Sequence, residues 1–189
     1  MREKREEWRE NQPDLDIDKL KFLDESSINC GMTRLYGRAP TNERVNDYVP
    51  DVRFERTSII GTLGLSGVDA TMMFKGTLNG DFFGGYVEYV LAPTISPGDI
   101  VVMDNCSAHK AIGVLDPIYE KGASVMFLPE YSPDLNPIEM MWSKIKSILR
   151  KLKPRTQDEL LDAMHDALET VEYSYIVGWF EHDGYIVNL

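Results

Sequence analysis

The sequence is poor in cysteine, in positive charge and in long apolar runs, and each shortage excludes a class of protein. Its two cysteines, Cys30 and Cys106, stand far apart without a CxxC pairing, which excludes a disulfide framework and a thiolate zinc site and predicts two buried thiols. The 20 Lys and Arg are outnumbered by 31 Asp and Glu, and the net charge of −11 argues against a protein that coats nucleic acid. No run approaches the roughly 18 apolar residues of a membrane span, and the N-terminus has no apolar signal core, so we expect a cytoplasmic protein without membrane contact.

The negative charge is concentrated near the C-terminus. Residues 156–189 contain eight acidic residues and no lysine or arginine, whereas the preceding 155 residues are nearly balanced. Six of the basic residues fall within residues 144–155. A local basic patch therefore persists inside an acidic chain.

Apolar patterning predicts one α/β domain. We divide the chain into a lead-in at residues 1–18, a domain at 19–155 and an acidic helical extension at 156–189 that packs on the same domain. The runs at 99–104 and 123–128 are apolar throughout, which indicates parallel strands covered on both faces. Further strands are predicted at 20–24, 57–65 and 70–74, with a turn at Ser66 and Gly67, and helices at 80–91, around 111–121 and from Ile138 onward.

Two of the predicted strands end in an acid followed by a polar residue. Asp24 follows the apolar run LKFL, and Asp104 follows IVVM. Ligands gather beyond the carboxyl ends of parallel strands, so neighbouring strands would place both aspartates in one cleft. Converging carboxylates are costly without a cation, and ligation by oxygen alone favours Mg²⁺ or Mn²⁺. Either aspartate taken alone is more often a turn cap.

A third acid, Glu139, stands at the start of a basic helix. Pro129, Pro133 and Pro137 hold the preceding segment in a non-helical loop, and Asn136 is predicted to cap the helix that begins at Pro137. At about 100° per residue, the face of Glu139 includes Ser143, Lys146, Arg150 and Lys153, and the predicted buried face includes Ile138, Met141, Trp142, Ile145, Ile148, Leu149 and Leu152. A basic face behind an acid suits a phosphate backbone running from a metal-bound phosphodiester, and an ordinary solvated helix face is the alternative.

Taken together, these motifs resemble a known family. Asp24 in FLDES, Asp104 in VVMDNCSAH and Glu139 in YSPDLNPIEMMW, with 34 residues between the second and third acids, resemble the DDE catalytic domain of mariner-superfamily and related bacterial insertion-sequence transposases. The resemblance covers about residues 20–153. It implies a ribonuclease H-like α/β fold, in which a mixed five-stranded sheet is flanked by helices, with extra C-terminal helices. It also implies that Asp24 and Asp104 lie on adjacent central strands.

The resemblance implies metal-dependent DNA cleavage and strand transfer. Two Mg²⁺ or Mn²⁺ ions about 3.5–4 Å apart would be held by the catalytic residues Asp24, Asp104 and Glu139, with Asp104 the better candidate for bridging both. Asp134 is an alternative third ligand, which the family pattern disfavours. The candidate contacts to the DNA backbone are Lys144, Lys146, Arg150 and Lys153.

Four further residues have secondary predicted roles. His109 fits the DNxxxH pattern of the family and is predicted to orient the site or touch phosphate, with a structural hydrogen bond as the alternative. Asn105 is predicted to hold Asp104 or a metal-bound water, or to cap the following turn. Tyr36 and Arg38 suggest a strand near the edge of the site.

The implied partner is DNA, both transposon ends and target, bound by a homodimer that is associated with the nucleoid of a bacterial cytoplasm. Residues 1–18 are too short for the helix-turn-helix units that precede the catalytic domain in the family, which suggests an upstream-encoded half or a truncated copy. Two alternatives remain open. One is another ribonuclease H-fold nuclease, such as a junction resolvase, and the other is a catalytically inactive, transposase-derived interaction module.

Overall fold

Five strands form one mixed sheet in the computed structural model, which describes residues 2–51 and 53–187; residues 1 and 188–189 of the predicted terminal segments lie outside this range. The strands are β1 (Leu20–Ile28), β2 (Thr57–Gly64), β3 (Gly67–Lys75), β4 (Ile100–Met103) and β5 (Ser124–Phe127), in the order β3-β2-β1-β4-β5. The helices are α1 (Arg2–Asn11), α2 (Gly80–Tyr86), α3 (Asp116–Glu120), α4 (Pro137–Leu152), α5 (Gln157–Glu169) and α6 (Tyr173–His182). The predicted α/β fold with a mixed five-stranded sheet is confirmed.

The central strand β1 joins the two halves of the sheet. It pairs with β2 in the antiparallel direction and with β4 in the parallel direction, and β4 pairs with β5 in parallel. Strands β4 and β5 are the two that uninterrupted apolar runs predicted to be parallel. These runs are apolar throughout because helices cover both faces of the strands.

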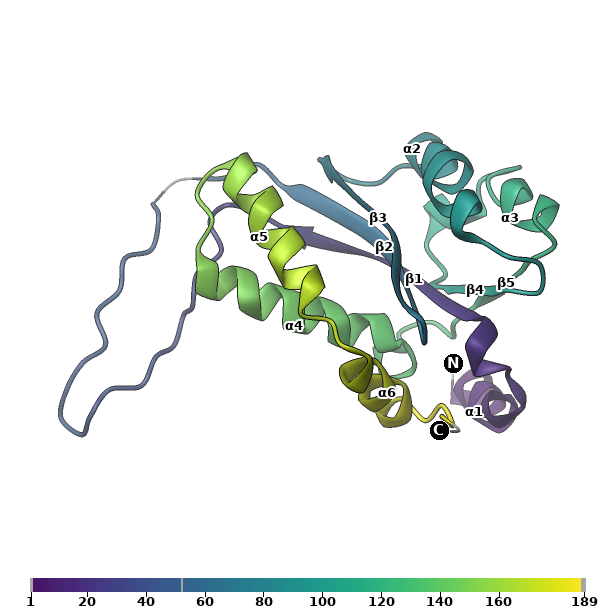
Figure 1. The fold of residues 1–189 in the computed structure, drawn as a ribbon, viewed down its shortest axis with the longest axis horizontal. Coiled ribbons are helices and arrows are strands. Elements are labelled where there is room, and N and C mark those ends of the chain that lie inside the picture. Colours follow the sequence, from purple (N-terminus) through teal and green to yellow (C-terminus); the bar gives the residue numbers. More distant parts are fainter. Residues whose placement is uncertain (1, 52, 188–189) are drawn as a thin grey trace.

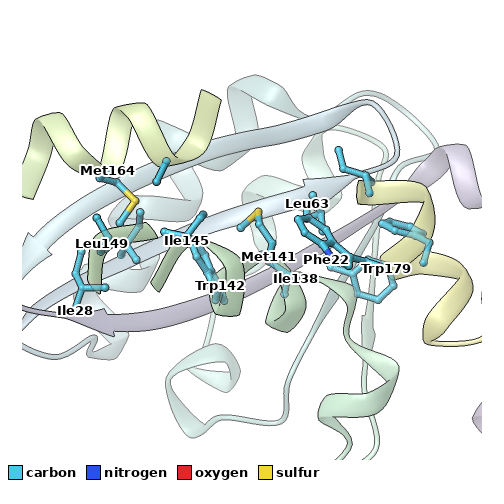
Figure 2. Packing of buried hydrophobic residues seen from close by; sticks show 14 of the residues in the cluster. Phe22, Ile28, Leu63, Ile138, Met141, Trp142, Ile145, Leu149, Met164 and Trp179 are labelled. Carbon is cyan, nitrogen blue, oxygen red and sulfur yellow. The ribbon is translucent and has the colours of Figure 1, made fainter. Parts of the chain in front are cut away.

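Each face of the sheet has its own apolar core. On one face Phe22 and Leu63 pack against α4, α5 and α6, with Trp142 at the centre of the helical layer (Figures 1 and 2). On the other face Leu23 and Ile60 pack against α2 and α3. The alternation of Phe22 and Leu23 between the two cores follows from the two-residue period of a strand.

Two strand boundaries differ from the predictions. Strand β1 continues four residues beyond Asp24, because its antiparallel pairing with β2 extends to Ile28 opposite Thr57, whereas its parallel pairing with β4 stops at Phe22 opposite Val102. Strand β3 begins at Gly67, so the hairpin turn consists of the two preceding residues, 65–66. The pairing of β2 with β3 is also interrupted by a register shift, next to which Ala70 has a positive φ of 49°.

The connection between β1 and β2 is a long segment that extends away from the body of the molecule (Figure 1), and its described residues, 29–51 and 53–56, form no helix or strand. Tyr36 and Arg38 lie in this segment and are exposed, so the strand suggested for them is not formed. Near the far end of α4, Lys153 contacts Asp47 of this segment through an ion pair. No helix in the described part of the chain is long and apolar enough to span a membrane.

The C-terminal helices cover α4 and return the chain to its beginning. Apolar residues of α5 and α6, among them Leu160, Met164 and Phe180, belong to the same core as α4, while most acidic side chains of these helices face solvent. The Gln12 side chain donates a hydrogen bond of 2.8 Å to the carbonyl of Asp183. The two ends of the described chain therefore lie close to each other (Figure 1).

Candidate active site

The first two acids approach each other because β1 and β4 are parallel neighbours. Asp24 lies two residues beyond the last parallel pair of β1, and Asp104 follows directly after β4. Asp24 also shares a face of the sheet with Phe22, which packs under α4, so its carboxylate points to the side on which α4 begins.

The third acid arrives from the start of α4. Pro137 occupies the first turn of the helix, and the backbone N–H of Glu139 donates to the carbonyl of Asn136 at 3.0 Å. The predicted side-chain cap does not form, because Asn136 has no side-chain hydrogen bond to the helix, and its Oδ1 is buried without a partner among the described residues. Backbone geometry and the proline thus begin this helix.

One cleft of about 500 Å³ brings the three acids together. It is lined by Asp24, Asp104, Asn105, Cys106, Leu128, Pro129, Glu130, Tyr131, Ser132, Pro133, Asn136 and Glu139. Asp134 is absent from the lining and instead pairs with Arg5 and Arg9 at 2.7 and 2.9 Å. Of the two alternatives for the third acid, only Glu139 faces the cleft.

The surroundings of Asp24 and Asp104 have opposite effects on their acidity. Burial, followed by the nearby charge of Glu139 and then that of Asp104, raises the pKa of Asp24 from 3.8 to about 8. The hydrogen bond from His109 holds the pKa of Asp104 below its usual value. The cleft therefore contains one carboxylate that is stabilised as an anion and one that favours a proton at neutral pH.

His109 and Asn105 have distinct places around Asp104. The buried imidazole of His109 lies with Nδ1 2.9 Å from Oδ1 of Asp104 and packs on Phe83, with 4.4 Å between ring centroids. Asn105 instead donates from Nδ2 to the carbonyl of Leu128 at 2.9 Å, which ties the end of β4 to the end of β5. Asp104 itself accepts the backbone N–H of Cys106 at 3.0 Å. One alternative for Asn105 was that it caps the following turn. The side chain of Asp104 caps this turn instead.

The four basic candidates on α4 and at its end are in different situations. Lys146 and Arg150 lie on the helix face of Glu139, and Arg150 is exposed. Lys144 points elsewhere, with its ammonium group 3.7 Å from the centre of the Tyr175 ring, and Lys153 pairs with Asp47. The predicted buried face holds except at its end, where Leu152 is 48% exposed and Ile148 is only partly covered.

Sequence reasoning missed part of the cleft. Cys106 was predicted to be buried but is exposed and lines the cleft, because it follows Asp104 in the turn after β4. Glu130 and Tyr131 also line it. Their positions in the sequence, close to Asp104 or inside the proline-bounded loop, could have indicated that they line the cleft.

The β3-β2-β1-β4-β5 sheet, with acids near the ends of its central parallel strands, defines a ribonuclease H-like domain. A sequence profile described as the DDE superfamily endonuclease family matches residues 19–161, about three quarters of the chain, and the chain belongs to this family. A comparison with curated protein sequences gives no match.

Solved structures of the Mos1 mariner transposase share this fold. The isolated catalytic domain matches with a TM-score of 0.68 and 16% identity, covering 100% of this chain and 98% of that domain. A pre-cleavage Mos1 transpososome matches with a TM-score of 0.76 and 15% identity, covering 98% and 63%, and a Mos1 paired-end complex with Mg matches with a TM-score of 0.76 and 16% identity, covering 96% and 58%. The chain therefore spans less than two thirds of the transposases in the complexes.

Proposed function

We propose that this chain is the catalytic domain of a DNA transposase, which cleaves DNA strands and transfers them to a target in a metal-dependent reaction. The observation that supports this most is the convergence of Asp24, Asp104 and Glu139, from three different elements, on one cleft. Membership of the DDE endonuclease family and the fold shared with Mos1 are consistent with it.

The donor set of the cleft fits Mg²⁺ or Mn²⁺. All three acids offer oxygen, and the raised pKa of Asp24 is the expected effect of partly buried carboxylates that lack a neutralising charge. No three His, Cys, Asp or Glu side chains within residues 2–51 and 53–187 stand close enough to surround one ion, so the carboxylates would have to rotate toward it. Related structures are described as complexes with Mg or with Mn. Two such ions would polarise the attacking and leaving oxygens of a phosphodiester.

The residues around the cleft have different roles in the proposed reaction. Asp104 supplies a carboxylate that its contact with His109 keeps ionised. Asp24 and Glu139 approach from the two other sides, and Asn105 fixes the turn behind Asp104. Repulsion from the ionised Asp104 would exclude a phosphate group until this charge is neutralised.

We propose that the DNA backbone leaves the cleft along α4. Lys146 and Arg150 follow Glu139 on one helix face, so successive phosphates would meet them. Lys144 and Lys153 would have to leave Tyr175 and Asp47 before contacting DNA. The Mos1 complexes are named for paired ends and strand transfer, and we extend to this chain action on paired ends as a homodimer.

The decisive measurement is cleavage of supercoiled DNA bearing candidate transposon ends in Mn²⁺. Asp104→Ala should abolish nicking, and the exposed Asp162→Ala on α5 should leave it unchanged as a matched control. Nicking that persists in Asp104→Ala contradicts the proposal. Cleavage without joining to target DNA would indicate another nuclease of this fold. A metal-binding site predicts that Mn²⁺ raises the Tm of the protein and that Asp24→Ala removes this rise. If there is no such rise, the chain would be an interaction module.

A further inference from the structure

Residues 129–136, called the cleft loop below, form half of the lining of the candidate cleft. Six of the twelve lining residues belong to it, and Glu139 follows three residues after its end. The position of this loop therefore sets both the shape of the cleft and the direction from which Glu139 enters it.

The cleft loop has little internal structure to hold it in place. Its backbone bonds are those of one 3₁₀ turn, from Leu135 N–H to Ser132 at 3.1 Å and from Asn136 N–H to Pro133 at 3.2 Å. Tyr131 has a positive φ of 55°, a left-handed conformation that a residue with a bulky side chain adopts only when its surroundings impose it. Within the loop, the only other bond is a long one of 3.3 Å from the Ser132 hydroxyl to the Glu130 carbonyl, so external contacts are needed to hold this conformation.

Helix α1 supplies these contacts through two arginines one turn apart. Nη1 of Arg5 donates to the carbonyl of Tyr131 at 3.1 Å and to Oγ of Ser132 at 2.8 Å. Nη2 of Arg5 and Nη2 of Arg9 both donate to Oδ2 of Asp134, at 2.7 and 2.9 Å. The Arg5 guanidinium thus touches three successive parts of the cleft loop, including the strained residue.

The geometry points to Arg5 and Arg9 as positioning residues, which hold the cleft loop in the conformation that completes the candidate active site. The inference rests on the proposed function for its activity readout only. An ordinary exposed ion pair contributes little, because solvent screens it. Here the Arg5 side chain is 26% exposed and makes three charge-assisted hydrogen bonds with its planar group, a geometry that a lysine does not reproduce.

The buried side of the loop is fixed separately. The Tyr185 hydroxyl donates to the Leu135 carbonyl at 2.8 Å, from the segment after α6. The loop is therefore anchored at its end by the C-terminal segment, and at its middle by α1. Loss of the arginines should free the part around Tyr131 without unfolding the domain.

The test compares Arg5→Ala, Arg9→Ala, Arg5→Lys and a matched control, Arg2→Ala, whose side chain pairs with Glu6 on the same helix. Hydrogen exchange of a peptide covering residues 130–136 should accelerate on the order of tenfold in Arg5→Ala, less in Arg9→Ala, and not at all in Arg2→Ala. Arg5→Lys should restore only part of the protection, because it keeps the charge but not the planar set of donors.

Activity should show the same ranking. The nicking rate at saturating DNA should fall at least tenfold in Arg5→Ala, because small misplacements of reacting groups slow catalysis strongly, while the DNA concentration that gives half the maximal rate stays the same. The Mn²⁺-dependent rise in Tm should persist, because Asp24 and Asp104 are outside the cleft loop.

The exchange measurement decides the inference independently of the reaction. If the unaltered protein does not nick DNA, the proposed function fails, yet faster exchange of the cleft loop in Arg5→Ala still supports the positioning role. Unchanged exchange in Arg5→Ala overturns the positioning role, whether or not the protein is active. If Arg5→Ala does not fold, the more exposed Arg9→Ala provides the same comparison.

Discussion

The environment of Asp24 penalises its negative charge. An acid whose pKa is about 8 in the folded protein and 3.8 in the unfolded chain binds a proton more tightly when folded. Its contribution to stability is fully present below pH 3.8 and is lost as the pH rises toward 8. A metal ion at the proposed site would therefore compete with this proton and would bind better as the pH increases.

Asp24→Asn removes the charge and keeps the shape. Without divalent ions we expect the free energy of unfolding at pH 8 to rise by roughly 2 kcal/mol, a value reduced for solvent screening, and the gain to vanish toward pH 4. Thermal unfolding in a chelator from pH 4 to pH 8 measures this, with Asp162→Asn as control. A variant that is less stable than the parent at pH 8 contradicts the expectation.

His109→Ala tests the other half of the carboxylate pair. Removal of the Nδ1 donor, 2.9 Å from Asp104, should raise the pKa of that carboxyl and loosen its orientation. We expect the Mn²⁺ concentration at the midpoint of a Tm titration to increase by about 10- to 100-fold. His165→Ala, which alters an exposed histidine on α5, is the control. Equal midpoints for His109→Ala and the parent would exclude a role in metal binding.

The place of a residue in the structure could be predicted from the sequence only where neighbouring residues in the chain indicate it. The three acids could be predicted because each belongs to a short motif at the end of a strand or the start of a helix. The contact of Arg5 with Asp134 could not, because 129 positions separate the two residues and neither has an unusual neighbourhood. The same holds for Lys144, whose contact with Tyr175 depends on how α6 crosses α4.

At the scale of elements, α4 links the core to the cleft. Its apolar face, with Trp142 at 1% exposure, packs on the sheet and fixes the helix axis, while Glu139 in the first turn faces the cleft. Helical periodicity predicted this division correctly along most of the helix. It did not predict the exposure of Leu152, because the helix ends there, where Lys153 adopts a left-handed conformation with φ 55°.

The extended segment between β1 and β2 should be the first part of the chain cut by a protease. Arg34, Arg38 and Arg44 are exposed there and belong to no helix or strand. Brief trypsin digestion, followed by mass spectrometry, should find the earliest cleavage after one of these residues. Earliest cleavage after Lys121 or Lys151 would show instead that contacts protect the segment.

At the scale of the whole molecule, the net charge of −11 opposes the proposed binding to DNA. The distribution of charge is compatible with DNA, although the net charge is not. Most acidic side chains of α5 and α6 are exposed on helices that cover α4, and they do not line the cleft.

Non-specific DNA affinity of this chain alone should be weak. We expect a Kd weaker than roughly 10⁻⁶ M at physiological salt. Lys146→Ala and Arg150→Ala should each reduce the slope of log affinity against log salt by about 1. Fluorescence anisotropy across a salt series measures both values, with Lys121→Ala on the α3 side as control. Slopes that do not change in either variant contradict the proposed path of the backbone.

The whole fold was predictable because two independent signals agreed. Uninterrupted apolar runs predicted the parallel strands, and the spacing of the acids resembled a family with this sheet. The extension of β1 to Ile28 was not predictable, because the residues after Asp24 are polar and become a strand only through pairing with β2.

The meeting of the two chain ends has a consequence during synthesis. The Phe22 ring packs edge-on against Phe180 and Tyr185, with 5.4 and 5.1 Å between ring centroids. A chain still leaving the ribosome therefore lacks the partners that cover its central strand, and it exposes apolar surface until residue 185 has emerged. Packing of this core therefore cannot be completed before residue 185 has emerged, and until then the exposed apolar surface favours aggregation.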